Sequence, residues 1–198
     1  MKKIPTVFKR DWNGDRSRVL PEVNPGCEWV LNGEGTATRK LDGTCCLVRA
    51  SRLYRRREIK PGEVLPPNFE LVAFDDETQK RVGWVPVGDG PEDRYHREAF
   101  PPEQSQALPD GTYELLGPKV QGNPEGFFKH ILVPHNAIEA FYNVPRTFDS
   151  LREWLSQHAY IEGLVFHHPD GRMAKIKLKD FGIRRVSENE ALAAGSSH

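Results

Sequence analysis

A single lysine stands inside a stretch that otherwise reads as a β-strand. The stretch "TRKLDGTCC", residues 38–46, sets Lys40 two positions before Asp42 and three before the turn residue Gly43. A free lysine titrates near 10.4, so roughly one molecule in a thousand carries a neutral amine at neutral pH. Two positive charges about 4 Å apart interact by about 4 kcal/mol at an effective dielectric of 20, equivalent to roughly three pKa units. A lysine kept among other cations is therefore a candidate nucleophile.

Three further stretches place charged side chains among apolar ones. "YELLG" contains Glu114, "IEGLVF" contains Glu162, and "KIK" contains Lys175 and Lys177. Lysines at such positions can hold phosphate oxygens, and carboxylates suit Mg²⁺ or Mn²⁺, which are hard ions that seek oxygen ligands. Residues of these types suit chemistry on a phosphate, and the candidate neighbours that could activate Lys40 are Lys175, Lys177 and a bound divalent metal.

The clearest predicted hairpin spans residues 160–182. Asp170-Gly171 is a pair that favours a two-residue type I′ turn, and such a turn fixes the register of both strands. With this register, one face holds Glu162, Leu164, Phe166, Lys175, Lys177 and Lys179. The other face, directed toward a core, holds Ala174, Ile176 and Leu178. A sheet face that mixes apolar side chains with charges is typical of a ligand surface.

The remaining elements predict an α+β fold built on antiparallel β-sheets with flanking helices. Strands are expected at 28–31, over "ATRKLDGTCCLVRA" with "RLYRRREI" as its partner, and at "FELVAF", "GWVPVG", "TYELLG" and "HILVPHNAI". Residues 61–110 carry half of the 16 prolines and read as a long, loop-rich insertion. One helix is expected at about 150–158, with Ser150 and Glu153 as a capping box. Its apolar face consists of Phe148, Leu151, Trp154 and Leu155.

Charge is balanced overall but segregated along the chain. The 198 residues carry 28 Lys and Arg against 28 Asp and Glu. Residues 49–60 and 171–185 each hold six Lys or Arg against one acid, whereas residues 61–114 hold twelve acids against four bases. Each basic run alone reads as a solvated surface, and "YRRRE" as a charged edge strand. Both runs lie next to the motifs above, which favours a polyanionic partner.

Neither a membrane segment nor a disulfide framework is expected. The sequence contains no run of about 18 apolar residues and no signal-peptide pattern, so we expect a cytoplasmic protein without a membrane partner. Cys45 and Cys46 are neighbours whose side chains would leave a strand on opposite faces, so we expect reduced thiols. The histidines at 130, 135, 167 and 168 lack metal-ligand spacing, and structural roles are expected for them.

In chain order, the stretches around Lys40, Glu114, Glu162 and the lysine pair resemble the motifs of the covalent nucleotidyltransferase superfamily of DNA ligases, RNA ligases and messenger-RNA capping enzymes. Within it, "KLDGTCC", "GWVPV", "YELLGPKVQGNPEG", "HILVPHN" and "IEGLVFHHPDG" are similar to the small stand-alone vertebrate-type 5′-to-3′ RNA ligase. The resemblance runs from about residue 36 to 182. It implies an ATP-grasp-like nucleotidyltransferase ligase core that binds ATP between its sheets and has no OB domain.

The resemblance also implies a mechanism and a set of site residues. Lys40 would attack ATP to form a lysyl-AMP intermediate, the AMP would pass to an RNA 5′-phosphate, and an RNA 3′-hydroxyl would seal the strand. The expected nucleotide-binding residues are Thr38, Asp42, Gly43, Arg55, Glu114, His130, Glu162, Lys175 and Lys177. Glu162 and Asp42 are the expected ligands of Mg²⁺ or Mn²⁺.

Some of these roles remain open between neighbouring residues. Glu114 is expected at the ribose hydroxyls and the backbone near Thr38 at the adenine. Arg55 is preferred over Arg57 for a contact with the ribose or phosphate. Either Phe128 or His130 is expected to stack on the adenine.

Three segments are expected: an irregular N-terminal segment at 1–35 packed on the core, an adenylyltransferase domain at 36–182, and a polar C-terminal tail at 183–198. We expect a monomer that acts on RNA with 5′-phosphate and 3′-hydroxyl ends. The alternatives are a DNA ligase, a GTP-using capping enzyme and a non-catalytic module that binds RNA ends. The expected lack of an OB domain weakens the capping alternative, and the complete set of lysines and glutamates argues against a non-catalytic module.

Overall fold

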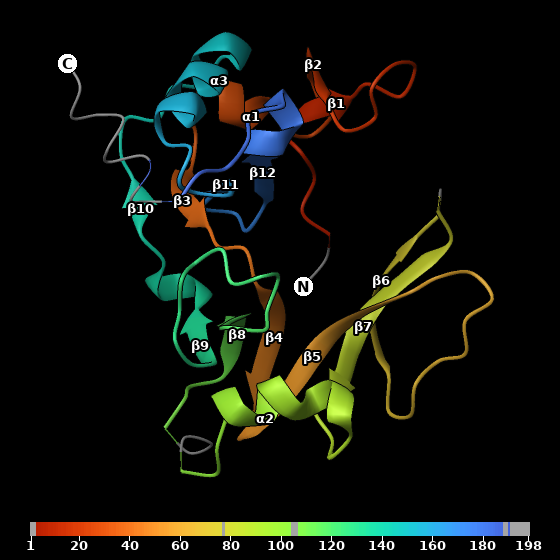
Figure 1. The fold of residues 1–198 in the computed structure, drawn as a ribbon. Helices are drawn as coiled ribbons and strands as arrows, with labels where there is room; N and C mark the ends of the chain where they lie inside the picture. Colours follow the sequence, from red (N-terminus) through yellow and green to blue (C-terminus); the bar gives the residue numbers. More distant parts are fainter. Residues whose placement is uncertain (1–2, 77, 104–106, 188–189, 191–198) are drawn as a thin grey trace. The chain divides into compact units, whose positions relative to one another are not determined.

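The computed structural model describes residues 3–76, 78–103, 107–187 and 190, whose strands form three sheets (Figure 1). The chain divides into two compact units. Unit 1 comprises Met1–Lys3 and Asp42–Ile138, and unit 2 comprises Ile4–Leu41 and Glu139–His198. The strands within each sheet pair antiparallel and the helices are few and short, which confirms the expected mixture of antiparallel sheets with flanking helices.

Unit 1 is built on a six-stranded sheet with the order β6-β7-β5-β4-β8-β9. The strands are β4 (Thr44–Arg49), β5 (Arg52–Ile59), β6 (Glu70–Asp75), β7 (Lys80–Pro86), β8 (Gly111–Leu116) and β9 (Ile131–Pro134). The helices are η1 (Pro91–Asp93), α2 (Arg94–Ala99) and η2 (His135–Ala137). A buried cluster on one face of the sheet includes α2 through Ala99 and consists of Cys46, Val48, Leu53, Ala99, Tyr113, Leu115 and Val120.

Most expected strands of unit 1 are confirmed, including the pairing of β5 with β4. The region 61–110 is more ordered than expected, because it contains α2 and η1 in addition to the expected strands β6 and β7. The helix α2 escaped the sequence analysis because its six residues bury only His96 and Ala99. Such a short helix shows no apolar periodicity.

Unit 2 contains a four-stranded sheet with the order β10-β3-β11-β12 and a two-stranded sheet β1-β2. The strands are β1 (Phe8–Arg10), β2 (Val19–Val23), β3 (Thr36–Lys40), β10 (Ala140–Phe141), β11 (Gly163–His167) and β12 (Met173–Lys177). The helices are α1 (Glu28–Leu31), α3 (Phe148–Gln157) and η3 (Leu178–Phe181). The largest fully buried side chains of its core are Phe8, Leu151, Leu155, Ile161, Leu164, Phe166 and Ile176.

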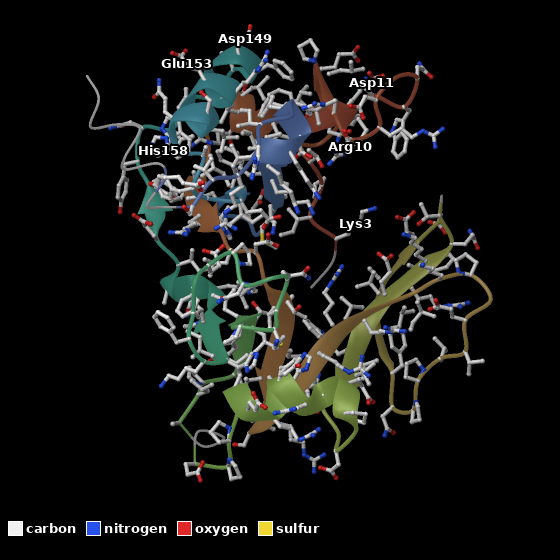
Figure 2. All side chains as sticks on the ribbon, in the orientation of Figure 1. Lys3, Arg10, Asp11, Asp149, Glu153 and His158 are labelled. Carbon is white, nitrogen blue, oxygen red and sulfur yellow. The ribbon has the colours of Figure 1, made fainter. Side chains whose placement is uncertain are left out.

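The helix α3 is confirmed, although it begins earlier than expected. Its N-cap is Thr147, whose side chain accepts a hydrogen bond from the Ser150 N–H, so the expected Ser150–Glu153 capping box is wrong. Leu151 and Leu155 are fully buried, and Glu153 lies with Asp149 on the exposed side (Figure 2).

The expected strand at 28–31 is wrong, because these residues form α1. Trp29 and Val30 are adjacent in the sequence and both are buried in the core. An alternating strand would direct adjacent side chains to opposite faces, whereas one helical turn buries both. Gly26 and Gly33, both at positive φ, flank this turn.

The β11–β12 hairpin is confirmed, but its register differs by one residue from the expected one. The His168 N–H donates to the Arg172 carbonyl across the turn. The loop therefore has three residues, 169–171, and Gly171 adopts a φ of 91°, as loops of this length require near their end. The Asp170 side chain accepts a hydrogen bond from the Arg172 N–H, which stabilises this longer loop.

This shift separates the lysines from the apolar residues. The buried face of the hairpin holds Leu164, Phe166, Ala174 and Ile176, each 0% exposed. The opposite face holds the pairs Gly163–Lys177 and Val165–Lys175. The expected mixing of Leu164 and Phe166 with the lysines is therefore wrong, because a slip of one residue moves every side chain of a strand to the other face.

The cysteines Cys27, Cys45 and Cys46 are free, as expected. In the part of the chain that the structure describes, no helix is long and apolar enough to cross a membrane. The three expected segments, including the adenylyltransferase domain at 36–182, stay predictions. Most of the expected tail, residues 188–189 and 191–198, lies outside the described residues.

Candidate active site

Two lysines meet one carboxylate on the sheet of unit 2. Lys40, the last residue of β3, lies opposite Gly163 of β11, which in turn lies opposite Lys177 at the end of β12. The Lys40 ammonium donates a hydrogen bond of 2.6 Å to Oε2 of Glu162, and the Lys177 ammonium donates to Oε1. The Glu162 side chain is 12% exposed. Two ammonium groups therefore share one largely buried carboxylate.

Gly163 allows this convergence. It stands between the two lysines in the sheet and has no side chain of its own. A Cβ atom at this position would lie 2.1 Å from the Ile176 carbonyl oxygen and 2.7 Å from Cα of Lys177. Glycine is therefore required here for the close approach of β11 to β12.

The two lysines keep Glu162 ionised. Burial by itself raises the pKa of the Glu162 carboxyl, but the charge of Lys40, together with the charge and hydrogen bond of Lys177, holds the pKa below its ordinary value of 4.5. Lys40 also donates a hydrogen bond of 3.3 Å to the Leu41 carbonyl, an acceptor that the sequence did not suggest. The Lys40 amine is thus held in one place by two acceptors.

Lys175 lies on the same sheet face, in the neighbouring row with Val165 and Thr38. Burial, together with the nearby charges of Lys177 and Lys40, lowers the pKa of Lys175 to about 8. Among the residues that the structure describes, no oxygen accepts a hydrogen bond from its ammonium group. A half-buried cation without such a partner is suited to hold an anion.

Thr38 is in contact with a histidine that the sequence analysis treated as structural. The Thr38 hydroxyl donates to the Val165 carbonyl at 3.3 Å, and its oxygen lies 3.0 Å from Nε2 of His167. His167 pairs with Thr36 in the sheet, on the same face as Thr38 and Lys40. The contact joins residues 129 positions apart and depends on the pairing of β11 with β3, so no local sequence pattern indicates it.

A second group of expected site residues lies in unit 1, around Glu114. Its Oε1 accepts a hydrogen bond of 3.1 Å from the Gly43 N–H, and its Oε2 lies 3.0 Å from Nε2 of His135. The other ring nitrogen of His135 lies 2.9 Å from the Thr112 hydroxyl. No local sequence pattern indicates this role of His135, because the contact joins strand β8 to η2, which directly follows β9.

Asp42, beside Gly43, donates its backbone N–H to Oε1 of Glu125 at 3.1 Å. A Cβ atom on Gly43 would lie 2.3 Å from the Leu115 carbonyl oxygen, so the start of β4 fits closely against β8. Unit 1 thus brings Asp42, Gly43 and Glu114 together, whereas Thr38, Lys40, Glu162 and the two lysines belong to unit 2.

The three consecutive arginines of β5 point to alternating faces of the sheet. Arg55 pairs with Cys46 in the register, shares the face of the buried cluster, and forms a 2.7 Å ion pair with the buried Asp93 before α2. Side chains alternate along a strand, so Arg56 points to the opposite face of the sheet from Arg55 and Arg57. That face also carries Cys45 and, opposite it on β8, Glu114. The structure therefore places Arg56, and neither of the two expected candidates, on the sheet face that carries Glu114.

The two candidates for adenine stacking have different surroundings. The His130 ring stacks on Tyr95, with the ring centres 4.5 Å apart, and its Nδ1 lies 2.7 Å from Oε2 of Glu98. Phe128 is 100% exposed. One face of His130 is therefore already covered by a protein ring, whereas Phe128 is open to solvent.

Several charges of the two basic segments are paired with acids. Arg49 forms a 2.7 Å ion pair with Glu70, and Arg172 forms a 2.8 Å ion pair with Asp170. The basic segments are thus less electropositive than a count of their residues suggests.

The expected metal ligands belong to different units, with Glu162 in unit 2 and Asp42 in unit 1. Among the described residues, no three His, Cys, Asp or Glu side chains gather as a metal-binding group. Mg²⁺ commonly takes one or two carboxylates and completes its shell with water and substrate phosphates. A carboxylate that is held ionised, such as Glu162, fits this kind of site.

Comparisons with known proteins agree with the motif pattern. A family model described as RNA ligase 1 matches residues 102–196. RNA ligase 1 of Danio rerio is 24% identical over an alignment 264 residues long, gaps included. The alignment covers 92% of this chain and 81% of that protein. RNA ligase 1 of Mus musculus is 24% identical over 219 residues, which cover 74% of this chain and 67% of that protein. These similarities confirm the resemblance to the stand-alone RNA ligase family.

Proposed function

We propose that this chain is an ATP-dependent RNA ligase, which joins RNA 3′-hydroxyl and 5′-phosphate ends through a covalent lysyl-AMP intermediate. The observation that carries the proposal is the group of three lysines around Glu162. The Lys40 amine is held at a fixed place by Glu162. Lys175 lies on the same sheet face, is half-buried, and has no hydrogen-bond acceptor among the described residues. This arrangement suits a nucleophile beside a phosphate site.

The reaction has three steps. In the first, Lys40 Nζ loses a proton and its lone pair attacks the α-phosphorus of ATP. A nitrogen–phosphorus bond forms, the bond from the α-phosphorus to the bridging oxygen breaks, and pyrophosphate leaves. In the second, an oxygen of the RNA 5′-phosphate attacks the same phosphorus, a phosphoanhydride bond forms, the nitrogen–phosphorus bond breaks, and the Lys40 amine takes up a proton. In the third, the RNA 3′-hydroxyl loses its proton and attacks the activated 5′-phosphorus. A phosphodiester bond forms, the phosphoanhydride bond breaks, and AMP leaves.

The residues around Lys40 orient its amine and stabilise the negative charge of the phosphates. Glu162 orients the Lys40 amine and, because its own pKa is held low, stays ionised while it does so. Lys177 and Lys175 hold phosphate oxygens as negative charge accumulates on them. Mg²⁺ or Mn²⁺, held by Glu162 with Asp42 as the second expected ligand, would screen the charge of the pyrophosphate leaving group.

The remaining expected contacts recognise the nucleotide. Glu114 accepts hydrogen bonds from the ribose hydroxyls in this proposal, and its contacts with Gly43 and His135 support this by fixing its orientation. For the contact with ribose or phosphate we propose Arg56 in place of Arg55, because Arg56 shares the face of Glu114. The backbone at Thr38 reads the adenine, and Phe128 or His130 stacks on it. The protein acts as a monomer in this scheme.

The experiment that tests this function follows a radioactive label. The protein is incubated with ATP or GTP, each labelled at the α-phosphorus, and with Mg²⁺ or Mn²⁺, then denatured. We expect label from ATP to stay on the protein and to leave it when nicked RNA is added, with a sealed strand as the product. Label from GTP alone would favour a capping enzyme. Sealing of nicked DNA alone would favour a DNA ligase. Absence of label would favour a module that only binds RNA ends.

A prediction about pH follows from Lys175. A lysine carries its charge below its pKa and loses it above, so Lys175 binds an anion well below pH 8 and poorly above it. If binding requires the charged form, the Kd for ATP rises about tenfold between pH 7 and pH 9, because only about a tenth of the molecules remain charged. Titration with an ATP analogue that has a methylene group between the α- and β-phosphates measures this without reaction.

The matched control is Lys175→Arg. A guanidinium keeps its charge throughout this pH range, so the variant is expected to bind the analogue with nearly constant affinity between pH 7 and pH 9. Wild-type affinity that stays flat over the same range would contradict the assignment of Lys175 as the titrating anion ligand.

A further inference from the structure

The loop between β1 and β2, residues 11–18, presents an exposed tryptophan beside an arginine. The Trp12 side chain is 67% exposed, and the Arg16 guanidinium carbon lies 6.0 Å from the centre of its ring. Neither residue belongs to the lysine site described above. A large aromatic ring left in solvent next to a cation is a common feature of surfaces that bind single-stranded nucleic acid.

The loop is ordered by its own side chains. The Asp11 carboxylate accepts a hydrogen bond of 2.8 Å from the Gly14 N–H and one from the Asp15 N–H. The Asp15 carboxylate in turn accepts from the Ser17 N–H at 2.9 Å and pairs with Arg18. The two acids of the loop are thus used within it. Trp12 is therefore held on a preorganised loop, so little conformational entropy is lost when it binds.

Two contacts fix the loop to the strand end that carries Lys177. Arg10, where β1 enters the loop (Figure 2), forms a 2.7 Å ion pair with Asp180, which is 1% exposed. Asp180 also accepts a hydrogen bond of 2.9 Å from the Lys177 N–H. At the other end of the loop, the Arg18 guanidinium occupies the space where a side chain on Gly182 would lie. The position of the loop relative to Lys177 is therefore set within unit 2.

We propose that the Trp12 loop, residues 11–18, binds single-stranded RNA next to the reacting end, with a nucleobase stacked on Trp12 and a phosphate held by Arg16. The inference rests on the proposed function, which places the reacting phosphates at Lys175 and Lys177. Arg16 is exposed and, among the described residues, has no carboxylate partner, so its charge is available to a phosphate. Stacking tolerates any base, as a ligase of varied RNA ends requires.

The surroundings of Trp12 favour RNA over a protein partner. The residues from Asn13 to Ser17 are all polar or glycine and all exposed, so the rest of the loop adds no apolar surface beside the ring. Protein interfaces usually place such a ring at the centre of a larger desolvated area. A lone ring flanked by a cation matches the alternation of base and phosphate along a single strand.

The test compares Trp12→Ala, Trp12→Phe and Arg16→Ala for binding of a fluorescent, 5′-phosphorylated single-stranded RNA at fixed salt and without ATP. Loss of one stacked base is expected to weaken binding by Trp12→Ala about 5- to 150-fold, whereas Trp12→Phe keeps an aromatic face and stays within about threefold of wild type. Arg16→Ala is expected to weaken binding and to reduce its dependence on salt.

ATP-derived labelling of each variant, measured without RNA, is expected to equal that of wild type, which also shows that the variant is folded. RNA affinity of Trp12→Ala equal to that of wild type would overturn the proposal and leave Trp12 to a protein partner. Failure of the proposed function would give a different result, because the wild-type protein would then take no label from ATP. RNA binding by wild type and by Trp12→Ala is measured without ATP, so it does not depend on that labelling.

Discussion

Replacing Lys40 with alanine is expected to reduce ATP-derived labelling of the protein by at least about a thousandfold, because the substitution removes the amine that bonds to AMP in the proposed mechanism. Lys40 Nζ is fixed by Glu162 and by the Leu41 carbonyl. The label that survives denaturation is measured with α-labelled ATP, and mass spectrometry of the wild-type protein locates the AMP adduct. An adduct on any residue other than Lys40 contradicts the mechanism.

Two controls separate loss of chemistry from loss of structure. Lys179→Ala removes an exposed lysine of the same unit and is expected to leave labelling unchanged. Lys40→Arg keeps a positive charge beside Glu162 but lacks a nucleophilic amine, so it is expected to take no label. Because the third step uses no lysine nucleophile, Lys40→Arg should still seal RNA supplied with an adenylylated 5′ end, within about tenfold of wild type.

Replacing Glu162 with glutamine is expected to lower both labelling and stability. The amide has the same shape but no charge, so Lys40 and Lys177 lose the carboxylate that they share and repel each other. We expect labelling to fall about a hundredfold, since the Lys40 amine is no longer oriented. The free energy of unfolding is expected to fall by about 1–3 kcal/mol, less than for a fully buried pair because the lysines are partly exposed.

The pH dependence of unfolding identifies the cause of the lost stability. The folded-state pKa of Glu162 is lowered, so its contribution is present above the unfolded-state pKa and disappears as the pH falls through the folded-state value. The difference between wild type and Glu162→Gln should therefore shrink as the pH falls below about 4.5. Glu58→Gln, which breaks the exposed pair with Lys80, is the matched control and should change stability by less than about 0.5 kcal/mol. A gap between wild type and Glu162→Gln that persists at low pH would contradict this account.

The motif order groups Lys40, Glu162, Lys175 and Lys177. In the structure the three lysines lie on one sheet, and Glu162 directly precedes its strand β11. Three of them lie in one hairpin, where local alternation limits the possible arrangements. The exact faces were wrong because the loop at 169–171 has one more residue than its Asp170-Gly171 pair suggests. The family resemblance, not periodicity, connected Lys40 to this hairpin.

Other parts of the candidate site had no local signal. Three consecutive arginines show no alternation, so the sequence could not tell that Arg56 and not Arg55 shares a face with Glu114. The contact of His135 with Glu114 depends on the pairing of β8 with β9, which only the folded sheet reveals. The helix α2 was missed for a related reason, since burial of Ala99 comes from packing on the sheet.

The ion pair between Lys40 and Glu162 joins residues that are 122 positions apart in the sequence. During synthesis on the ribosome, Lys40 emerges long before β11 and β12, and it is then an ordinary solvated lysine. Closing so large a loop is slow relative to forming the local hairpins, so the contact between Lys40 and Glu162 forms among the last features of the fold. A nascent or truncated chain that ends before Glu162 therefore carries Lys40 without the carboxylate that orients its amine.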